Sequence, residues 1–244
     1  MNPVLLLSHN ALDCTKRCVE SITNQDIPTK IVLIDNGSSD ETVEWAESQQ
    51  SNDFEFVAFA ENRGVSYGWN MGLRTMFEAG TEYVLVPNND VYLPAWFYST
   101  LLSYDVPFVT GISVGSMEEI ATPPERKELA PSPDFSCFLI RRSMWDMVGP
   151  LDEKMINYAS DLDWHIRAHR AGIHLMNAGV PFYHERSSTL NMADPIDRRR
   201  IQLRADEDRA VFTEKWGVSA GGPDYQALFL PELFGVDDVK TVIG

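Results

Sequence analysis

Three short polar side chains follow one apolar run of this sequence, and their types suit the binding of a metal ion. The run Val84–Val86 ends at Pro87, and Asn88, Asn89 and Asp90 come directly after it. Asn and Asp are common in turns, because they bond their own main chain and tolerate unusual backbone angles. A carboxylate flanked by amide oxygens is also a ligand set for a hard divalent cation. The stretch therefore predicts either a turn or a metal site.

Polar residues follow three earlier apolar runs in the same way. Ser8 to Asn10 follow the first run, Asp35 to Gly37 the second, and Asn62 to Gly64 the third. In open α/β sheets, ligands bind in the crevice beyond the carboxyl ends of the strands. Four polar ends on one edge of a sheet are therefore stronger evidence for a binding site than any one of them alone.

Two of these ends offer specific contacts to a nucleotide. Asp35 could accept hydrogen bonds from a base or a ribose, and Arg63 could meet a diphosphate. Both also have structural interpretations. Asp35 can belong to the turn before the next helix, which Ser39 or Asp40 would cap, and Arg63 can be a solvated charge in a loop. The residues themselves leave these alternatives open.

The elements that must position these residues alternate between strand and helix over the first 90 residues. Apolar runs predict strands at 3–7, 30–34, 54–59 and 82–86, and the segments between them predict helices at 12–23, 41–50 and 66–79. This order implies a mostly parallel central sheet with right-handed crossovers and flanking helices. The fold class is therefore α/β, with a Rossmann-like N-terminal half.

Three glycines recur every four residues at the third predicted helix, namely Gly64, Gly68 and Gly72. This spacing puts them on one helix face. Because glycine lowers helix propensity, three of them need a reason. We expect the helix backbone to approach a sheet or a ligand closely there.

After residue 105 the regular alternation stops. The sequence predicts a Pro-rich, charged loop at 122–135, a strand at 136–140, a helix at 160–171, one or two short strands within 174–184, and a long charged helix at 194–216. In that last helix a basic run, 198–200, precedes Asp206, Glu207 and Asp208, and we expect ion pairs along the helix face.

Bulk composition argues against several classes of protein. The net charge of -16 disfavours general nucleic-acid binding, which needs a basic footprint. No apolar run of about 18 residues exists, so no membrane span is expected, and the N-terminus lacks the features of a signal peptide. Cys14, Cys18 and Cys137 favour packed free thiols in a reducing compartment over a disulfide or a metal pair. We therefore expect a cytoplasmic protein.

The order of these segments resembles family 2 glycosyltransferases of the GT-A fold, in particular their rhamnosyltransferase-like members. "IVLIDNGSSDET" resembles the second strand and nucleotide turn of that family, "ENRGVSYGWNMGL" its Asn-x-Gly segment and glycine-rich helix, and "VLVPNND" its metal-binding Asp-x-Asp. "FLIRRSMWDMVGPLDEKM" and "YASDLDWHIRAHRAG" resemble acceptor-side segments, and "KWG" at 215–217 resembles a common ending. The resemblance covers about residues 3–217.

The resemblance implies a single GT-A-type domain in which 1–110 bind the nucleotide sugar, 111–217 bind the acceptor and carry the base, and 218–244 form a tail. It implies inverting transfer from a UDP-, dTDP- or GDP-linked sugar to an acceptor hydroxyl, with Mn²⁺ or Mg²⁺ as cofactor. A glycan, a lipid-linked molecule and a protein all remain open as acceptor. The residues expected to bind the nucleotide sugar are Ser8, Asn10, Asp35, Gly37, Asn62, Arg63, Gly64, Asn70, Asn88 and Asn89.

The resemblance also assigns the catalytic and metal-binding residues. Asp161 is the expected general base, and Asp90 and His184 are the expected metal ligands. Asp163 and Trp164 are expected on the acceptor side or in support of it. The arginine four residues after Asp163 is at the spacing of a helix ion pair, and Trp164 either stacks on a sugar or packs in the core.

Two departures from the family pattern keep other functions open. Asn88 stands in place of the first Asp of Asp-x-Asp, and Ser160 stands where many relatives carry Glu. A catalytically inactive relative that binds nucleotide sugars is therefore one alternative. A sugar-nucleotide nucleotidyltransferase is another, disfavoured because "LLLSHNALDCTKR" has no glycine-rich phosphate loop after the first strand.

Overall fold

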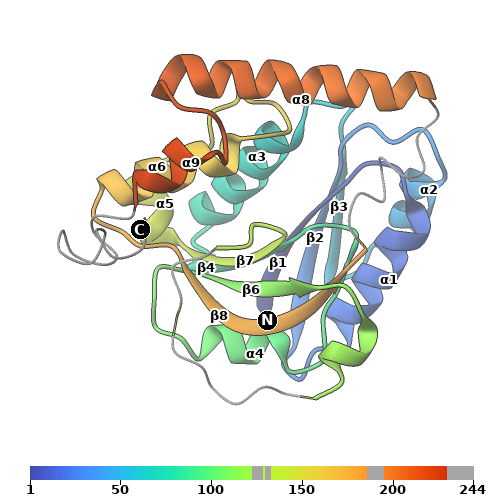
Figure 1. The fold of residues 1–244 in the computed structure, drawn as a ribbon. Helices are drawn as coiled ribbons and strands as arrows, with labels where there is room; N and C mark the ends of the chain where they lie inside the picture. The colour runs from blue at the N-terminus through green and yellow to red at the C-terminus, as the bar shows by residue number, and fades with distance from the viewer. Residues whose placement is uncertain (123–128, 130–132, 186–194, 230–244) are drawn as a thin grey trace.

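The computed structural model describes residues 1–122, 129, 133–185 and 195–229, and these residues form one eight-stranded sheet between helices (Figure 1). The strand order is β3-β2-β1-β4-β7-β6-β8-β5. The strands are β1 (Asn2–Ser8), β2 (Thr29–Asp35), β3 (Phe54–Ala58), β4 (Tyr83–Pro87), β5 (Val91–Tyr92), β6 (Phe108–Val114), β7 (Cys137–Arg141) and β8 (Met176–His184).

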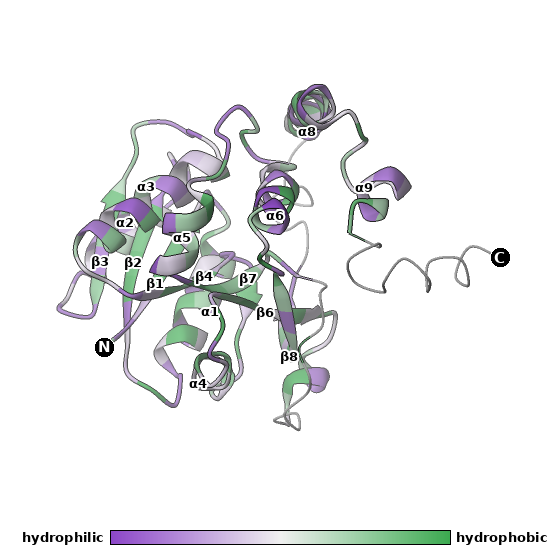
Figure 2. Ribbon diagram, turned by 90° about the vertical axis from the view of Figure 1, so that its left-hand side faces the viewer, coloured by the Kyte–Doolittle hydropathy of each residue, from purple (hydrophilic) through white to green (hydrophobic). Residues whose placement is uncertain are grey.

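Helices cover both faces of this sheet. Figure 2 shows α1 and α4 on one face and α3, α5 and α6 on the other, while α8 lies across the top of the molecule in Figure 1. The helices are α1 (Leu12–Thr23), α2 (Thr42–Ser48), α3 (Val65–Glu78), α4 (Phe97–Leu102), the 3-10 helix η1 (Met117–Ile120), α5 (Arg142–Val148), α6 (Ser160–Arg170), α8 (Pro195–Trp216) and α9 (Pro223–Ala227). None of the helices described here combines the length and the apolar character that a membrane crossing requires.

The N-terminal half confirms the predicted alternation. Strand β1 pairs in parallel with β2 and β4, and β2 pairs in parallel with β3. The central strands bury continuous apolar runs because helices cover both of their faces. The carboxyl ends of all four strands therefore point to one edge of the sheet.

The glycine spacing of α3 allows a close approach to this sheet. A Cβ atom on Gly68 would lie 2.5 Å from Leu7 Cδ1, and one on Gly72 would lie 2.4 Å from Leu5 Cδ1. Side chains at these positions would push α3 away from β1. The expectation of a close backbone approach is confirmed, and the sheet is the partner.

The C-terminal half is less regular. Strand β7 is antiparallel to both β4 and β6, and β8 runs parallel to β6. The predicted strand 136–140 and helices 160–171 and 194–216 correspond to β7, α6 and α8, whereas the short strands expected within 174–184 are one nine-residue strand, β8. Strands β5 and β6 and helices α4, α5, η1 and α9 were not predicted.

Part of the expected tail packs against the domain. In α9 and just after it, Tyr225 and Phe229 are buried, and they share a small core with Met155, Ile166 and Phe212. Residues 218–229 thus cover α6 and α8. The rest of the tail, 230–244, and positions 123–128 and 130–132 of the Pro-rich loop lie outside the described residues. The three cysteines are buried free thiols, as expected.

Candidate active site

The polar ends of β1 and β2 meet side by side. Ser8 is in register with Asp35, and both side chains are buried. The Asp35 carboxylate accepts a hydrogen bond from the Ser38 backbone N–H at 2.8 Å and further bonds from the hydroxyls of Ser38 and Ser8. Asp35 therefore closes the turn after β2, in agreement with the structural interpretation of its sequence position. A contact with a nucleotide stays a prediction.

The turns after the first three strands are connected to one another by hydrogen bonds. Asn10, at φ 55°, accepts a 2.7 Å bond from the backbone N–H of Ser39. Asn36 Oδ1 accepts a 2.8 Å bond from the Arg63 N–H. A Cβ on Gly37 would lie 2.5 Å from the carbonyl carbon of Glu61, so only glycine fits there. We call the predicted strand-end residues the strand-end rim: Ser8, Asn10, Asp35, Gly37, Asn62, Arg63, Gly64 and Asn88.

The segment before α3 adds a cation to this rim. Asn62 Oδ1 accepts a 2.9 Å bond from the Gly64 N–H. The Arg63 guanidinium lies 4.6 Å from the ring centroid of Tyr67, and half of the Arg63 side chain is exposed. Its nearest carboxylate, on Glu61, is 3.9 Å away. The arginine is thus accessible to an anion that approaches the rim.

Asn70 does not lie with the rim. It is buried in α3, where its amide oxygen accepts from the Leu151 N–H at 2.8 Å. Its amide nitrogen donates to the Leu151 carbonyl and to Glu153 Oε1, both at 2.9 Å. These bonds tie α3 to the segment after α5, so the structure gives Asn70 a structural role.

The two expected metal ligands lie in contact, although 94 residues separate them. Strands β5 and β8 are antiparallel and place His184 opposite Val91, next to Asp90. Asp90 Oδ1 is 3.1 Å from His184 Nε2, and the two side chains are 11% and 13% exposed. Asn89 is turned toward α1, where it donates to Thr15 Oγ1 at 3.0 Å.

A carboxylate beside an imidazole is a plausible pair of ligands for a divalent cation. Oxygen and imidazole donors suit Mn²⁺, and oxygen donors suit Mg²⁺. Within the part of the chain that the structure describes, no cluster of three or more His, Cys, Asp or Glu side chains is arranged to hold a metal. A metal site at Asp90 and His184 stays a prediction.

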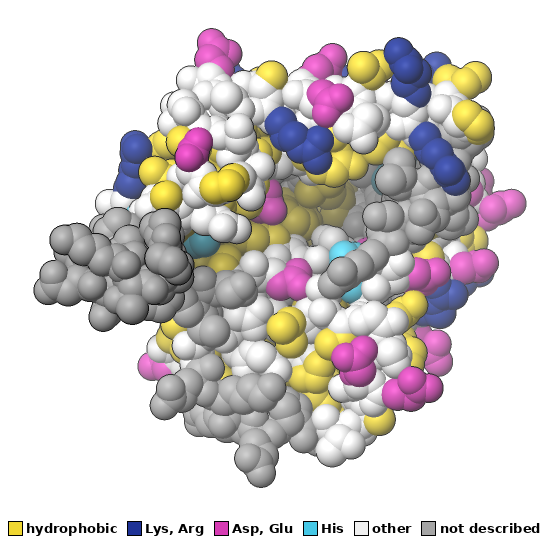
Figure 3. Space-filling view, viewed as in Figure 1, with side chains coloured by type: hydrophobic (Ala, Val, Ile, Leu, Met, Phe, Trp, Pro, Cys, Tyr) yellow, Lys and Arg dark blue, Asp and Glu magenta, His cyan; other side chains and the backbone are white. Residues whose placement is uncertain are grey.

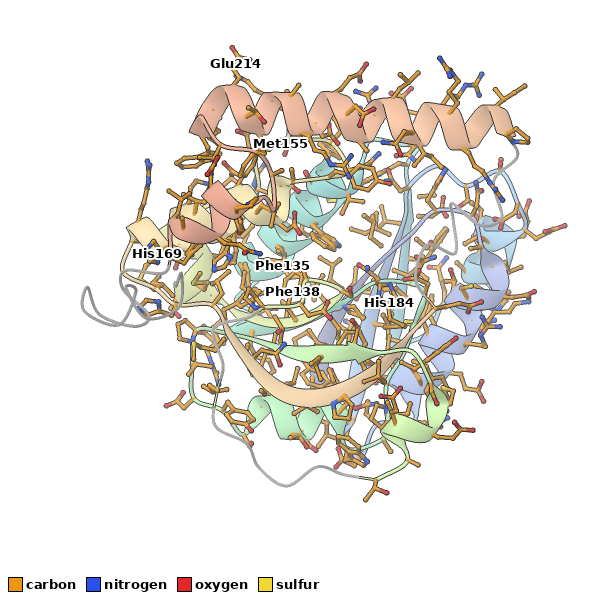
Figure 4. The ribbon with its side chains drawn as sticks, viewed as in Figure 1. Phe135, Phe138, Met155, His169, His184 and Glu214 are labelled. Atoms are coloured by element: carbon orange, nitrogen blue, oxygen red, sulfur yellow. The ribbon has the colours of Figure 1, made fainter. Side chains whose placement is uncertain are left out.

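A cavity of about 980 Å³ opens next to the rim. Figure 3 shows the hollow below α8, with apolar side chains in its depth and acidic and histidine side chains around it. Of the rim residues, Asn88 borders it, and Val65, the first residue of α3, lies beside it. Figure 4 places His184 and His169 toward opposite sides of this face, with Phe135 between them. The other lining residues come mainly from α6, α9 and the segments 133–136, 157–159 and 173–175.

Asp161 faces this cavity from the first turn of α6. Ala159, at φ 63°, turns the chain into the helix just before it. Burial raises the pKa of the Asp161 carboxyl, against the hydrogen bonds from the backbone of Leu162 and of Asp161 itself. A carboxylate with a raised pKa is a stronger base than an ordinary aspartate.

Asp163 points away from the cavity and is completely buried. Its Oδ2 accepts from Arg167 Nε at 2.9 Å, which confirms the expected i,i+4 pair. Its Oδ1 lies 2.7 Å from Lys215 Nζ and 3.0 Å from Trp216 Nε1. The "KWG" segment therefore anchors α8 to α6 through Asp163.

Trp164 packs in the core and does not border the cavity. Its indole N–H donates to the Gly149 carbonyl at 2.9 Å. Its ring lies 5.3 Å from the ring of Phe108 and 6.4 Å from that of Phe135. Of the two interpretations of Trp164, the structure supports packing.

The far wall of the cavity was not predicted from the sequence. Tyr225 contributes a hydroxyl 2.9 Å from His165 Nδ1, and Phe229 stacks on His165 at 4.3 Å between ring centroids. Burial, with additional repulsion from His169 and His174, lowers the pKa of His165 to about 4. Only the i,i+4 spacing of His165 and His169 was visible in the sequence.

Asp134 is a second residue that the sequence did not single out. It lines the cavity and accepts 2.9 Å bonds from the backbone N–H groups of Ser113 and Ser136. Burial opposes ionisation, but the bonds from Ser113 and Ser136 outweigh it and lower the pKa of Asp134. It lies within the predicted Pro-rich loop, where nothing distinguished it from an exposed charge.

Comparison with known proteins gives one family match. The model of a family described as Glycosyl transferase family 2 matches residues 4–145. Uncharacterized proteins of Mycobacterium bovis and Mycobacterium tuberculosis are 26% identical over 140 residues, which cover 50% of this chain and 53% of theirs. The chain thus matches about half the length of these curated relatives.

Solved structures share the fold at low identity. Staphylococcus aureus TarS in complex with UDP has a TM-score of 0.57 and 15% identity, over 87% of this chain and 72% of that one. GalNAc-T7 with UDP, GalNAc and Mn²⁺ has a TM-score of 0.61 and 14% identity, over 75% and 43%. The Pyrobaculum calidifontis mannosyltransferase PcManGT with GDP-Man and Mn²⁺ has 0.55 and 17%, over 95% and 79%.

Proposed function

This chain belongs to glycosyl transferase family 2, and from that premise we propose that it transfers a sugar from a nucleoside-diphosphate sugar to an acceptor hydroxyl with inversion. One observation carries the proposal: the rim residue Asn88 borders the same cavity as the Asp161 carboxylate, and so does Val65, which directly follows the rim residue Gly64. A transferase of this kind needs a donor site and a base on either side of the reacting sugar carbon.

The rim is the proposed donor site. Its polar side chains and tight turns lie at the carboxyl ends of parallel strands, where α/β sheets bind nucleotides. The accessible Arg63 guanidinium suits the charge of a diphosphate. The complexes of TarS with UDP and of PcManGT with GDP-Man support a nucleotide-linked donor in this fold.

Asp90 and His184 are the proposed ligands of Mn²⁺ or Mg²⁺. A cation bound there would neutralise the negative charge of the departing diphosphate. The Mn²⁺ named with GalNAc-T7 and with PcManGT supports a divalent cation. Asn88 supplies an amide where the family pattern has a carboxylate, so it still offers an oxygen, but one negative charge fewer weakens the binding of the cation.

Asp161 is the proposed general base. It takes the proton of the acceptor hydroxyl as that oxygen attacks the sugar carbon from the side opposite the diphosphate, which inverts the configuration at that carbon. Burial has raised the pKa of Asp161, so the carboxylate accepts this proton more readily than an exposed aspartate would. The contact between the two expected metal ligands and the position of Asp161 favour an active enzyme over an inactive relative.

The proposed function is tested by screening a panel of UDP-, dTDP- and GDP-linked sugars for binding and turnover. Thermal shift with Mn²⁺ identifies donors that stabilise the protein, and release of the nucleoside diphosphate then measures turnover. We expect at least one donor to raise the Tm and to be hydrolysed or transferred. A protein that neither binds nor turns over any of these donors would refute the proposed function.

The metal assignment has its own control. Calorimetry of the matching nucleoside diphosphate should give tighter binding with Mn²⁺ or Mg²⁺ than with chelator. Asp90→Asn should remove most of that difference, whereas Asp105→Asn, at an exposed position, should leave it unchanged. Equal affinity in metal and in chelator for the unaltered protein would rule out the metal site.

A further inference from the structure

The short loop before α6, residues 155–158, lies between α3 and α8. Figure 4 shows Met155 beneath α8, whereas Glu214 points away from the molecule on the opposite side of that helix. Met155 is completely buried, and Asn157 and Tyr158 line the cavity. The loop thus connects the inside of the molecule to the segment that carries Asp161.

On the α8 side, one carboxylate holds three consecutive backbone groups of this loop. Asp208 Oδ1 accepts from the Ile156 N–H at 3.0 Å. Asp208 Oδ2 accepts from the N–H groups of Asn157 at 2.9 Å and Tyr158 at 3.0 Å. The Asp208 side chain is 1% exposed, so these charge-assisted bonds form away from water. They are the bonds that fix the conformation of the loop from this side.

On the other side, the first turn of α3 holds the same loop. Ser66 donates its hydroxyl to the Met155 carbonyl at 2.5 Å and its backbone N–H to the Ile156 carbonyl at 3.1 Å. The Val65 N–H donates to Asn157 Oδ1 at 3.1 Å. This turn follows directly on the rim residue Gly64. The loop is therefore bonded to the donor side and to α8 at once.

The space at Gly64 shows how closely the two sides meet. Gly64 has φ 85°, and a Cβ there would lie 2.2 Å from Ile156 Cγ2. The rim and the loop are thus in direct contact. A shift of the loop would change the distance between the donor site and the residues that follow the loop.

We propose that Asp208 is a positioning residue, which holds the 156–158 loop so that Asp161 stays at the correct distance from the donor site. Asp161 is three residues beyond the loop, and α6 begins at Ser160. This inference rests on the proposed function, because it concerns the placement of the proposed base. Asp208 itself does not border the cavity; it acts through the loop.

A residue that only stabilised the fold would behave differently in kinetics. Loss of stability lowers the amount of active protein but leaves the kcat of the folded fraction unchanged. A misplaced base lowers kcat and leaves the affinity for the donor nearly unchanged. A misplacement of about 1 Å costs on the order of 10²-fold in rate, so the two cases are separable.

The test compares three variants. Asp208→Asn keeps the size of the side chain but replaces one acceptor oxygen by an amide that would face backbone N–H groups. Ser66→Ala is a milder change, because it removes the hydroxyl bond to the Met155 carbonyl and keeps the two backbone N–H bonds from α3 to the loop. Asp206→Asn is the matched control on the same helix, because Asp206 is exposed and its side chain bonds Gln202 and Arg209 of α8.

With the best donor from the panel, we expect Asp208→Asn to lower kcat by about 10- to 100-fold while the donor KM changes by less than about threefold. Ser66→Ala should lower kcat in the same direction by a smaller factor, and Asp206→Asn should match the unaltered enzyme. An unchanged kcat in folded Asp208→Asn, or a loss that appears only in the donor KM, would overturn the proposal. If Asp208→Asn does not fold, an unchanged kcat in Ser66→Ala would overturn it.

A second measurement does not depend on turnover. Carbon-13 NMR of the aspartate carboxyls follows the titration of Asp161 in each protein. We expect its pKa to move toward the ordinary value in Asp208→Asn and in Ser66→Ala, because a displaced loop exposes it, and to stay unchanged in Asp206→Asn. If the unaltered protein turns over no donor, the proposed function fails. An Asp161 titration unchanged in both loop variants would overturn the positioning role in either case.

Discussion

The strand-end rim and the contact between α6 and α8 are built in different ways. In the rim, backbone hydrogen bonds between paired strands fix the positions of the turns, and side-chain bonds connect neighbouring turns. Ser8, for example, bonds Asp35, which is 27 residues away in the sequence but lies on the adjacent parallel strand. Between α6 and α8, buried carboxylates reach across more than 50 residues, as Asp163 does to Trp216. We call that second set of contacts, made by Asp163, Lys215 and Trp216, the α6–α8 anchor.

From this difference we infer where single substitutions should lower the stability of the fold most. In the rim, strand pairing already fixes the positions of the turns, so a single side chain contributes only a part of their stability. The α6–α8 anchor depends on one buried carboxylate, Asp163, and its removal takes one ion-pair partner from Arg167 and one from Lys215. Lys215 shows the strength of the anchor: burial works against its charge, but bonds to Asp152 and Asp163 outweigh burial and raise the pKa of Lys215.

The largest expected effect is that of Asp163→Ala. The carboxylate is completely buried and pairs with both Arg167 and Lys215. Loss of one partner from a fully buried pair typically costs about 3–5 kcal/mol. Because Arg167 and Lys215 are partly exposed and Lys215 keeps Asp152, we expect the free energy of unfolding to fall by about 3 kcal/mol, the lower end of that range. Urea denaturation measures it, with the exposed Asp206→Ala as control, which should stay within about 0.5 kcal/mol. A loss below about 1 kcal/mol would show that the anchor is not where stability depends on single charges.

A smaller loss of stability is expected for Asp35→Ala in the rim. The substitution leaves the partly buried N–H of Ser38 without its acceptor, which costs about 1 kcal/mol, the lower end of the range for a buried group. Because the turn carries the proposed donor contact, the affinity for the nucleoside diphosphate should fall as well. Urea denaturation and calorimetry on one preparation test both. Unchanged nucleotide affinity with lowered stability would leave Asp35 with the turn role alone.

A pH-dependent effect is expected from His165 of α6, which lies against α9. The pKa of His165 is lowered to about 4, so below pH 6.5 the unfolded chain takes up a proton that the folded protein does not. Stability should therefore fall as the pH drops from about 6.5 to about 4. Tyr225, His169 and His174 face this ring, and none of them supplies a compensating negative charge at these pH values.

His165→Gln tests this by removing the titrating group. The Tm of the variant should fall less than that of the unaltered protein over the same pH range. Asp134 and Asp152 have lowered pKa values and lose their contributions below the ordinary aspartate range, so they act outside this window. Asp161, with its raised pKa, acts in the opposite direction and is present in both proteins. Identical pH curves for the two proteins would mean that His165 is accessible to protons in the folded state.

The sequence predicted the rim well because its elements are local. Apolar runs that end in polar residues specify strands and their carboxyl ends, and the parallel alternation places those ends together. The contact between Asp90 and His184 was also expected, although from family resemblance and not from spacing. Gly68 and Gly72 were expected to allow a close approach, and the structure supplies β1 as the partner.

The contacts of α8 could not be predicted because a buried carboxylate has no local signature. Ion pairs do form along the α8 face, Arg204–Glu207 at 2.9 Å and Arg209–Asp206 at 3.3 Å, but their arginines lie outside the basic run 198–200 that the sequence pointed to. Asp208 stands next to them in the sequence, yet it is buried and bonds the 156–158 loop. Which of three neighbouring acidic residues turns inward depends on the orientation of the helix, and the sequence does not contain that information in readable form.

Helix α5 escaped prediction for a similar reason. It begins at Arg142, immediately after β7, with no glycine, proline or capping side chain between the two elements. Strand β6 lies in a segment without alternating polarity, because its first four residues are all buried. Both elements are determined by their packing partners and not by their own composition.

The central claim is that the rim binds the donor while Asp161 performs the proton transfer, and Asp161→Asn tests it most directly. The substitution keeps the size of the side chain and removes only the proton acceptor. We expect unchanged donor affinity by calorimetry and a turnover rate lower by about 10²- to 10⁴-fold, the usual contribution of a general base. Asp161→Asn protein that is folded, binds the donor and transfers at nearly the original rate would contradict the account.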